Sequence, residues 1–214
     1  MTEARLPRRV LVANRGAVAA RVIRTLRRMG IESVAVYSEA DAGLPYVGAA
    51  DRAVAIGPAP AQQSYLNQAR LLEVARETGA DAVHPGYGFL SENAGFAEAV
   101  QQQGLCFIGP SPRWIRALGH KTQARAFMAG QGMPQAPSSP VLASSDEALV
   151  AAARIGYPVL VKPAGGGGGI GMLPARDAQE LAAAWAKASG IAAKFFGTAE
   201  LYLERLIEAP RHIE

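Results

Sequence analysis

The sequence predicts an α/β protein whose first half forms a mostly parallel sheet. Three observations support this class. Short apolar runs alternate with helical patterns through residues 1–110, which is typical of parallel sheets covered by crossover helices. Half of the 214 residues are hydrophobic, enough for a sizeable core in one large domain or two of ordinary size. A run of glycines between two later strand patterns indicates a binding loop in the second half.

Five apolar runs predict the strands of the first sheet. They occupy residues 8–14, 31–38, 53–56, 81–84 and 105–108, and the helical patterns between them occupy residues 17–29, 67–78 and 94–103. Asn67 suits the N-cap of the second helix, and Gly79 suits its end. We therefore predict a Rossmann-like domain over residues 1–112.

Ligands of such sheets bind at the carboxyl ends of the strands. Two turns lie at this edge, residues 14–16 and residues 84–93. The second turn, HPGYGFLSEN, contains two glycines, a proline and two aromatic residues, where a plain connection would be short and polar. We expect this edge of the sheet to carry function.

The pattern changes after Pro112. Helical patterns cover residues 113–118, 122–131, 146–154 and 177–189, strand patterns cover residues 157–162, 172–173 and 200–207, and three prolines make residues 133–140 an extended connection. Leu181 and Trp185 mark the apolar side of the last helix, so we expect Trp185 to be a core residue. We divide this half into a helical linker (113–140), a small domain (141–200) and the first strand and hinge of a further lobe (201–214).

The most informative segment is the glycine run after Lys162. Five consecutive glycines from Gly165 to Gly169, and then Gly171, separate two strand patterns. Each costs about 0.5–1 kcal/mol relative to alanine, and a structural turn needs only one or two of them. Unhindered N–H groups can wrap the oxygens of a polyphosphate. We predict a phosphate-binding flap with Lys162 as a fixed positive charge beneath it; the alternative is an inert linker.

Two common nucleotide motifs do not fit this segment. Gly166, Gly168 and Gly171 match the spacing of the dinucleotide fingerprint, but that motif opens a helix, and here Pro174 follows within three residues. A P-loop places its lysine after the glycines, whereas Lys162 precedes them. The predicted geometry is therefore strand, flap, strand.

Composition argues against several other classes. The net charge is +4, and eight arginines lie within residues 1–28. Arg21, Arg24 and Arg28 share one helix face, which we expect to be solvated, because no aromatic residues are interleaved for base stacking. No apolar run approaches the about 20 residues of a membrane-spanning helix, and no signal-peptide core is present. We expect a cytoplasmic protein with no nucleic-acid or membrane partner, and its single cysteine, Cys106, should be buried in a strand.

The final residues offer one more candidate. His212 and Glu214 are two residues apart in an extended pattern, so their side chains would share a face. A metal or nucleotide contact is one interpretation, and two ordinary surface side chains are the other.

Six segments resemble the biotin carboxylase component of biotin-dependent carboxylases. They are VLVANRGAVAARVIRTLRRMGI, AVAIGPAPAQQSYLN, HPGYGFLSEN, FIGPSP, the flap with its lysine, and YLERLIEAPRHIE. The resemblance is collinear over nearly the whole chain. It implies a Rossmann-like (pre-ATP-grasp) domain, then a small lid domain with the flap, then the start of an ATP-grasp lobe at residues 201–214.

The resemblance also implies roles for particular residues. Lys121 and Lys162 would hold the phosphates of ATP, and Glu204 and Ile207 would lie at the adenine hinge with His212 nearby. The flap would consist of Gly166, Gly167, Gly168, Gly169 and Met172. The family activates bicarbonate with ATP and Mg²⁺ to form carboxyphosphate, and then carboxylates biotin on a carrier domain. A carboxyltransferase passes the carboxyl group on, and the complete enzymes are expected to be homodimers.

Two departures from the family pattern leave alternatives open. Ile170 stands where acyl-CoA carboxylases usually have arginine, which looks more like the urea carboxylase branch. The family's Mg²⁺ ligands, bicarbonate-binding and catalytic arginine segment and biotin pocket come after the position of Glu214, so no catalytic or metal-binding residue is predicted here. A non-catalytic nucleotide-binding or assembly module and another ATP-grasp ligase therefore remain alternatives. The final acceptor, whether acyl-CoA, pyruvate or urea, is also open.

Overall fold

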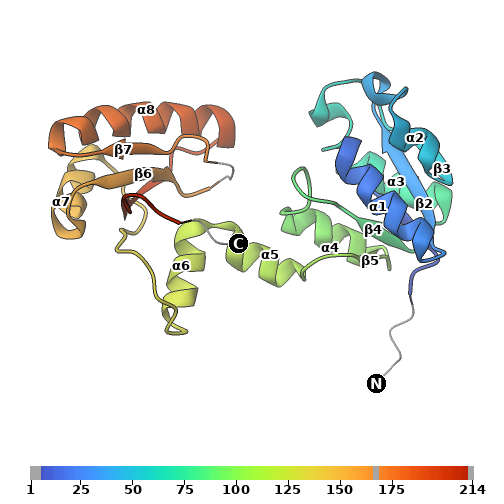
Figure 1. Ribbon diagram of the computed structural model, residues 1–214, viewed down its shortest axis with the longest axis horizontal. Coiled ribbons are helices and arrows are strands. Elements are labelled where there is room, and N and C mark those ends of the chain that lie inside the picture. The colour runs from blue at the N-terminus through green and yellow to red at the C-terminus, as the bar shows by residue number, and fades with distance from the viewer. Residues whose placement is uncertain (1–5, 166–168, 212–214) are drawn as a thin grey trace. The chain divides into compact units, whose positions relative to one another are not determined.

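The chain folds into two compact units in a computed structural model that describes residues 6–165 and 169–211 (Figure 1). Unit 1 ends at Arg116, and unit 2 begins at Ala117. Unit 1 contains a five-stranded parallel sheet, and unit 2 contains a three-stranded antiparallel sheet. None of the helices within the described ranges is long and apolar enough to cross a membrane.

Unit 1 has the alternation of strands and helices that the sequence predicts. Its strands are β1 (Arg9–Val12), β2 (Glu32–Tyr37), β3 (Arg52–Ala55), β4 (Ala82–His84) and β5 (Cys106–Phe107), in the order β3-β2-β1-β4-β5. The longer helices are α1 (Gly16–Arg28), α3 (Gln68–Thr78) and α4 (Ala94–Gln102). Asn67 caps α3, since its side chain accepts from the backbone N–H of Arg70, and Gly79 ends the helix with φ +65°. The prediction of a Rossmann-like sheet is confirmed.

Both faces of this sheet are buried, because alternate side chains of β1 belong to different cores. Val10 and Val12 share a cluster with Ile23 of α1, whereas Leu11 shares one with Leu71 of α3 and with apolar residues of α4. Helices α1 and α2 (Pro45–Ala49) therefore cover one face, and α3 and α4 cover the other (Figure 1). This three-layer arrangement leaves the carboxyl edge of the sheet for the two turns singled out in the sequence.

Three short elements between β2 and α3 were not predicted. They are the 3-10 helix η1 (Glu39–Asp41), helix α2 and the 3-10 helix η2 (Ala61–Gln63). Elements of three to five residues carry too little hydrophobic periodicity for a prediction. Tyr46 of α2 is 2% exposed, and its hydroxyl donates to the carbonyl of Val36 at 3.0 Å. The side chain thus satisfies its polar group inside the core.

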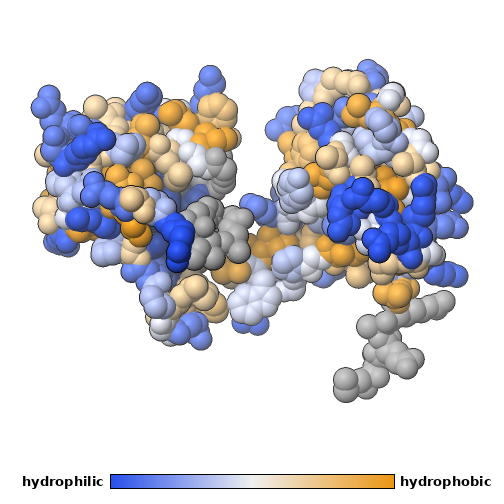
Figure 2. Space-filling model, in the orientation of Figure 1, coloured by the Kyte–Doolittle hydropathy of each residue, from blue (hydrophilic) through white to orange (hydrophobic). Residues whose placement is uncertain are grey.

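The surface of unit 1 confirms one expectation and corrects another. Helix α1 exposes Arg21, Arg24 and Arg28 as predicted, and Figure 2 shows hydrophilic side chains gathered over this helix. The expectation that Cys106 is buried was wrong, because its side chain is exposed while Phe107 is buried. Strand β5 is a two-residue edge strand whose side chains alternate between faces, and Phe107 is the one that faces the core.

Unit 2 is a small antiparallel sheet packed against helices. Strand β6 (Val159–Pro163) pairs with β7 (Leu173–Ala175) and β8 (Leu201–Arg205) on its two sides. The helices of unit 2 are α6 (Lys121–Ala129), α7 (Ser145–Ile155) and α8 (Ala178–Phe196), whereas α5 (Pro112–Gly119) contains the boundary between the units and packs its Ile115 in the core of unit 1. Side chains of α7, α8 and the three strands form one core, which includes Ala148, Ala152, Val159, Val161, Ala175, Leu181, Leu201 and Leu203.

Helix α8 runs to Phe196, whereas the pattern predicted an end at residue 189. The prediction stopped there because Gly190 disfavours a helix interior by about 1 kcal/mol. Ala188 and Ala192, on either side of that glycine, are fully buried, so packing outweighs the local preference. Trp185 packs partly buried against the same core. The finer division of residues 113–214 into linker, lid and hinge stays a prediction.

The two turns at the carboxyl edge of unit 1 meet between β1 and β4. Asn14 is 2% exposed, and its Nδ2 donates to the carbonyls of Pro85 at 2.8 Å and Tyr87 at 3.0 Å. Gly86 has φ +68°, and a Cβ there would lie 2.6 Å from Asn14 Nδ2 and 2.7 Å from Val18 Cγ1. Both the dihedral angle and the close approach therefore require glycine at this position.

Replacing Gly86 by alanine should destabilise unit 1 more than the same change at Gly88. Both glycines have φ +68°, so each alanine loses about 1–2 kcal/mol in the left-handed region. The new Cβ at Gly86 also overlaps its neighbours, which adds about 1–3 kcal/mol, whereas no described atom lies within 4 Å of a Cβ at Gly88. Native-state hydrogen exchange of amides in β1 and β4 measures the loss of unfolding free energy in each variant. Equal losses in the two variants would contradict the close approach of Gly86 to Asn14 and Val18.

Candidate functional site

The pairing of β6 with β8 brings sequence-predicted residues from both strands together. The antiparallel register sets Lys162 opposite Tyr202, and Glu204 lies two residues further along β8. Because alternate residues of a strand share a face, these three side chains lie on one side of the sheet. Val161 and Leu203 point into the core on the other side. This face of the small sheet thus carries a group of polar side chains, of which Lys162 and Glu204 are partly exposed and Tyr202 is fully buried.

Glu204 is the centre of a cluster of charged and polar side chains. Its Oε2 accepts from Lys162 Nζ at 2.9 Å, and its Oε1 accepts from the Tyr202 hydroxyl at 2.7 Å and from Arg125 Nη1 at 3.2 Å. The side chains of Lys162 and Glu204 are 17% and 14% exposed. Such limited exposure strengthens these pairs relative to surface ion pairs. We call these four side chains the Glu204 cluster.

Opposing effects set the protonation of this cluster. Burial alone would raise the pKa of Glu204, but hydrogen bonds from Lys162 and Tyr202 and the charges of Lys162 and Arg125 outweigh it, and the pKa is lowered. Burial, and then the Glu204 carboxylate, raise the pKa of Tyr202, so its phenol stays neutral. With two cationic side chains and one carboxylate, the cluster carries a net positive charge near neutral pH. It can therefore attract an anionic group.

Lys121 lies against the start of the glycine segment. It is the first residue of α6, and its backbone N–H donates to the carbonyl of Ala164 at 3.1 Å. Its Nζ donates to the carbonyl of Gly165 at 3.3 Å. Ala164 and Gly165 directly follow β6, whose fourth residue is Lys162. The structure thus brings the two predicted lysines to the same end of β6.

The described part of the glycine segment has the predicted geometry of strand, flap and returning strand. Strand β7 runs antiparallel to β6, with Leu173 opposite Val161. Gly171, at the return, has φ +78°, and a Cβ there would lie 3.0 Å from Pro163 Cγ and 3.2 Å from Ile191 Cγ2. Glycine is therefore needed at position 171, where the returning chain packs against β6 and α8. Gly166, Gly167 and Gly168 lie outside the described residues.

Three further predicted residues, Gly169, Met172 and Ile207, are exposed or partly exposed. Gly169 has φ +76°, and its carbonyl accepts from the N–H of Met172 at 3.3 Å. The side chain of Met172 is 39% exposed, and that of Ile207, beyond the end of β8, is 58% exposed. His212 and Glu214 lie outside the described residues.

Arg125 and Tyr202 were not predicted. Arg125 Nε donates to Ser138 Oγ at 3.0 Å, and its Nη2 donates to the carbonyl of Ala136. The i, i+4 spacing of Lys121 and Arg125 does indicate a shared helix face. That spacing does not show which residues this helix face contacts. Tyr202 lies in an apolar strand pattern, which is typical of a core residue. Both residues therefore needed the tertiary structure to be found.

In unit 1, a second polar cluster supports the turn over residues 84–93. The Tyr65 hydroxyl donates to Asp41 Oδ2 at 2.6 Å, and Arg15 Nη1 lies 3.3 Å from the same oxygen. The ring of Tyr65 stacks on Phe89 with centroids 5.3 Å apart, and the Arg15 guanidinium lies 5.8 Å from the Phe89 ring centre. Tyr87 in this turn is 74% exposed. The turn is thus packed firmly at Phe89, while its Tyr87 side chain is exposed to solvent.

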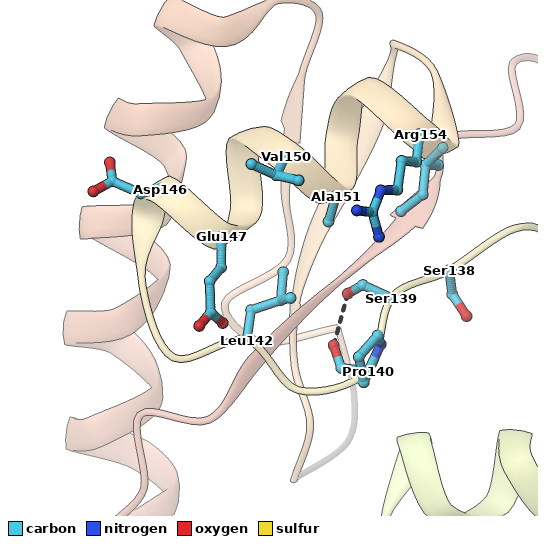
Figure 3. Close-up of a pocket in the computed structure, with 10 residues that line it drawn as sticks. Ser138, Ser139, Pro140, Leu142, Asp146, Glu147, Val150, Ala151 and Arg154 are labelled. Atoms are coloured by element: carbon cyan, nitrogen blue, oxygen red, sulfur yellow. Dashed lines mark hydrogen bonds between the residues drawn. The ribbon is translucent and has the colours of Figure 1, made fainter.

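A cavity of about 500 Å³ lies beside α7 and the extended segment (Figure 3). Leu142, Val150 and Ala151 contribute apolar surface to it, and the Ser139 hydroxyl at its edge donates to the carbonyl of Pro140 at 2.7 Å. The lysines of β6 and α6 do not line this cavity. It is therefore separate from the predicted phosphate site.

The described residues do not form a metal site by themselves. Within residues 6–165 and 169–211, no group of three or more His, Cys, Asp or Glu side chains is arranged to hold a metal ion. We therefore assign no Mg²⁺ ligand to the described part of the chain.

Replacing Glu204 by glutamine should destabilise unit 2 by about 1–3 kcal/mol at pH 7, because hydrogen bonds to a charged group are lost. The folded-state pKa of Glu204 lies below the ordinary value of 4.5. Its contribution is therefore complete above that pH and is lost as pH falls through the lowered pKa. Denaturation followed by Trp185 fluorescence in a Trp114→Phe background measures the difference against pH.

The matched control is Glu180→Gln, which changes an exposed carboxylate that lies 3.6 Å from Arg176 Nη1 and accepts from the Arg176 backbone N–H at 2.8 Å, a bond that the glutamine oxygen can keep. It should alter stability by less than about 1 kcal/mol. A difference between wild type and Glu204→Gln that persists unchanged at acid pH would contradict the role of the charged carboxylate.

Comparison with known proteins agrees with this geometry. The family model described as "Biotin carboxylase, N-terminal domain" matches residues 7–115, and the model "Carbamoyl-phosphate synthase L chain, ATP binding domain" matches residues 120–214. The biotin carboxylase of Halalkalibacterium halodurans is 48% identical over 208 residues, which are 97% of this chain and 46% of that protein. The α subunit of mitochondrial methylcrotonoyl-CoA carboxylase from Oryza sativa is 48% identical over 96% of this chain and 28% of its own length.

Solved structures give the same result. A biotin carboxylase from Campylobacter jejuni, described as a β,γ-ATP complex, matches with a TM-score of 0.93 and 40% identity over 96% of this chain and 46% of that one. The biotin carboxylase domain dimer of Hydrogenobacter thermophilus 2-oxoglutarate carboxylase, in complex with MgADP, ADP and bicarbonate, matches with a TM-score of 0.92 and 42% identity over 95% and 45%. The chain thus spans about half the length of the biotin carboxylases it matches, and it belongs to the biotin carboxylase family.

Proposed function

We propose that this chain supplies the N-terminal domain and the phosphate-binding flap of a biotin carboxylase. The complete enzyme would be an ATP-dependent ligase that uses bicarbonate to carboxylate biotin on a carrier domain. Related structures are described with ATP, MgADP, ADP or bicarbonate, which supports the same ligands here. Because the chain spans about half the length of its relatives, the activity is proposed for the whole enzyme.

The observation that carries this proposal is the placement of two lysines at the end of β6 from which the glycine segment begins. Lys162 lies near the end of β6, and the Lys121 ammonium contacts the carbonyl of Gly165 where the flap begins. A polyphosphate requires fixed positive charges together with accessible N–H groups. The proposed nucleotide-binding residues are Lys121, Lys162, Gly166, Gly167, Gly168, Gly169, Met172, Glu204, Ile207 and His212.

The proposed chemistry starts with attack of a bicarbonate oxygen on the γ-phosphorus of ATP. The bond to the bridging oxygen breaks, ADP leaves with its electron pair, and carboxyphosphate forms. Negative charge spreads over the transferred group and the leaving oxygen in the transition state. Lys121 and Lys162, held by the fold before the reaction, would stabilise this charge without reorganisation. A ureido nitrogen of biotin would then bond to the carboxyl carbon, as the bond from that carbon to the phosphate oxygen breaks and the departing phosphate takes the proton of the nitrogen.

Other elements of the proposal lie in the rest of the enzyme. We place the Mg²⁺ ligands, the catalytic residues and the biotin pocket there, and we propose a biotin carrier domain and a carboxyltransferase as partners. A homodimer in the cytoplasm is the proposed state of the complete enzyme. Ile170 is 43% exposed and contributes no charge to the flap, and the final carboxyl acceptor would be selected by a separate domain.

Replacing Lys162 by alanine should weaken ATP binding about 10- to 100-fold, because a hydrogen bond to a charged group contributes about 1.5–3 kcal/mol. Broadening of the β- and γ-phosphate signals in ³¹P NMR measures this affinity even when it is weak. Arg176→Ala is the control, since Arg176 is 75% exposed and pairs only with Glu180 among the contacts described for it. Equal ATP affinity in wild type and Lys162→Ala would overturn the phosphate assignment.

Residues 1–214 alone should show little or no ATP hydrolysis that depends on bicarbonate and biotin, because the proposed catalytic groups lie in the other half of the family's length. Fusion to the C-terminal half of the Halalkalibacterium halodurans biotin carboxylase, a 48% identical relative, should restore it. Release of phosphate measures turnover in both proteins. Strong biotin-dependent turnover by residues 1–214 would contradict this division of the site.

A further inference from the structure

Arg125 is not among the residues assigned to the nucleotide, yet it joins three separate segments of unit 2. Its guanidinium donates to Glu204 Oε1 of β8 at 3.2 Å and to Ser138 Oγ of the extended segment at 3.0 Å, and it also reaches the carbonyl of Ala136. The side chain is 23% exposed. One planar group with several donors can hold all these acceptors at fixed angles.

The first consequence concerns the charge of Lys162. The carboxylate of Glu204 has two oxygens, and Lys162 occupies Oε2 while Arg125 and the Tyr202 hydroxyl occupy Oε1. A carboxylate that is shared in this way does not neutralise the ammonium by itself. Without Arg125, the Tyr202 hydroxyl would still bond to Oε1, but Lys162 would be the only cationic side chain among the described partners of this carboxylate. Arg125 thus keeps positive charge available at the base of the flap.

The second consequence concerns Lys121. Lys121 and Arg125 are four residues apart on α6, so both lie on one face of the helix. Hydrogen bonds from the N–H and Nζ of Lys121 to the carbonyls of Ala164 and Gly165 connect the first turn of α6 to the end of β6. Arg125 fastens the next turn to β8, and Gln135 adds a bond from its Nε2 to the Arg125 carbonyl at 2.7 Å. Two anchors one turn apart fix the helix that carries Lys121.

We propose that Arg125 is a positioning residue for the phosphates of ATP. By occupying one oxygen of Glu204 and tying α6 to β8, it holds Lys162 and Lys121 in their binding positions while touching no part of the nucleotide itself. This inference rests on the proposed ATP-binding function. It adds a residue whose contribution is made wholly through the two lysines.

The test compares two probes that differ in their phosphates. ATP and adenosine are titrated against the 214-residue chain, and broadening of the adenine H8 signal in ¹H NMR gives the affinity for each. The variants are Arg125→Met, which keeps an apolar stem, and Arg125→Lys, which keeps one charge but loses the planar fork. Arg176→Met is the control, an arginine of the same unit paired with a surface glutamate.

We expect Arg125→Met to weaken ATP binding about tenfold, within the range for residues coupled through one ion-pair network. Adenosine binding should change less than about twofold, because Lys162 and Tyr202 still hold Glu204 and only lysine-to-phosphate contacts are weakened. Arg125→Lys should recover part of the ATP affinity, and Arg176→Met should match wild type.

Unchanged ATP affinity in a folded Arg125→Met protein would overturn the positioning role. Equal losses for ATP and adenosine would also overturn it, since they would indicate a general structural defect. If Arg125→Met does not fold, the Arg125→Lys comparison of ATP with adenosine decides in the same way. Failure of wild type to bind ATP at all would instead overturn the proposed function, and this inference with it.

Discussion

The second unit depends on how the charge of a mostly buried lysine is compensated. Lys162 and Glu204 are brought together by the antiparallel pairing of β6 with β8, and their Nζ and Oε2 atoms lie 2.9 Å apart. A buried ammonium without a partner would be strongly destabilising, but a carboxylate reserved for it alone would cancel its charge. Sharing the carboxylate with Arg125 and Tyr202 satisfies both requirements. The glycine segment then begins where this positive charge is held.

The first unit also contains buried polar groups that are held by hydrogen bonds, at the carboxyl edge of its parallel sheet. Asn14, buried at the end of β1, holds the carbonyls of Pro85 and Tyr87, and glycine at position 86 lets the turn approach it. Burial alone would raise the pKa of Asp41, but hydrogen bonds from Tyr65 and Arg15 lower it. In both units, therefore, the pairing of the strands sets the positions of the polar residues. A hydrogen-bonded carboxylate, Asp41 in unit 1 and Glu204 in unit 2, then holds the neighbouring side chains in place.

Much of this fold could be predicted from the sequence, because its strands are short apolar runs separated by strong turn signals. Asn67 and Gly79 fixed the ends of α3 correctly, and the glycine segment was correctly placed between two strands. Predictions failed where local pattern and packing disagree. Cys106 looked buried but faces outward from an edge strand, and Gly190 looked like a helix end but lies within α8 because its neighbours are buried.

The candidate site was predictable only in part, for a physical reason. Lys162 stood out because the glycines follow it directly along the chain. Lys121 and Glu204 entered through a resemblance, and neither spacing nor composition shows that they meet Gly165 and Lys162 in space. Arg125 was missed entirely, because the partners of its guanidinium lie 11 to 79 residues away along the chain. Contacts at such separations are decided by the pairing of β6 with β8 and by the path of the extended segment.

Nucleotide binding beside β6 and β8 is tested most directly by hydrogen–deuterium exchange of the 214-residue chain with and without a millimolar, non-hydrolysable ATP analogue. We expect slower exchange in peptides from β6 through β7 and in β8, with the turn over residues 84–93 unchanged. Bound nucleotide that leaves exchange in the β6–β7 peptides unaltered, or that protects only the cavity beside α7, would contradict binding beside β6 and β8.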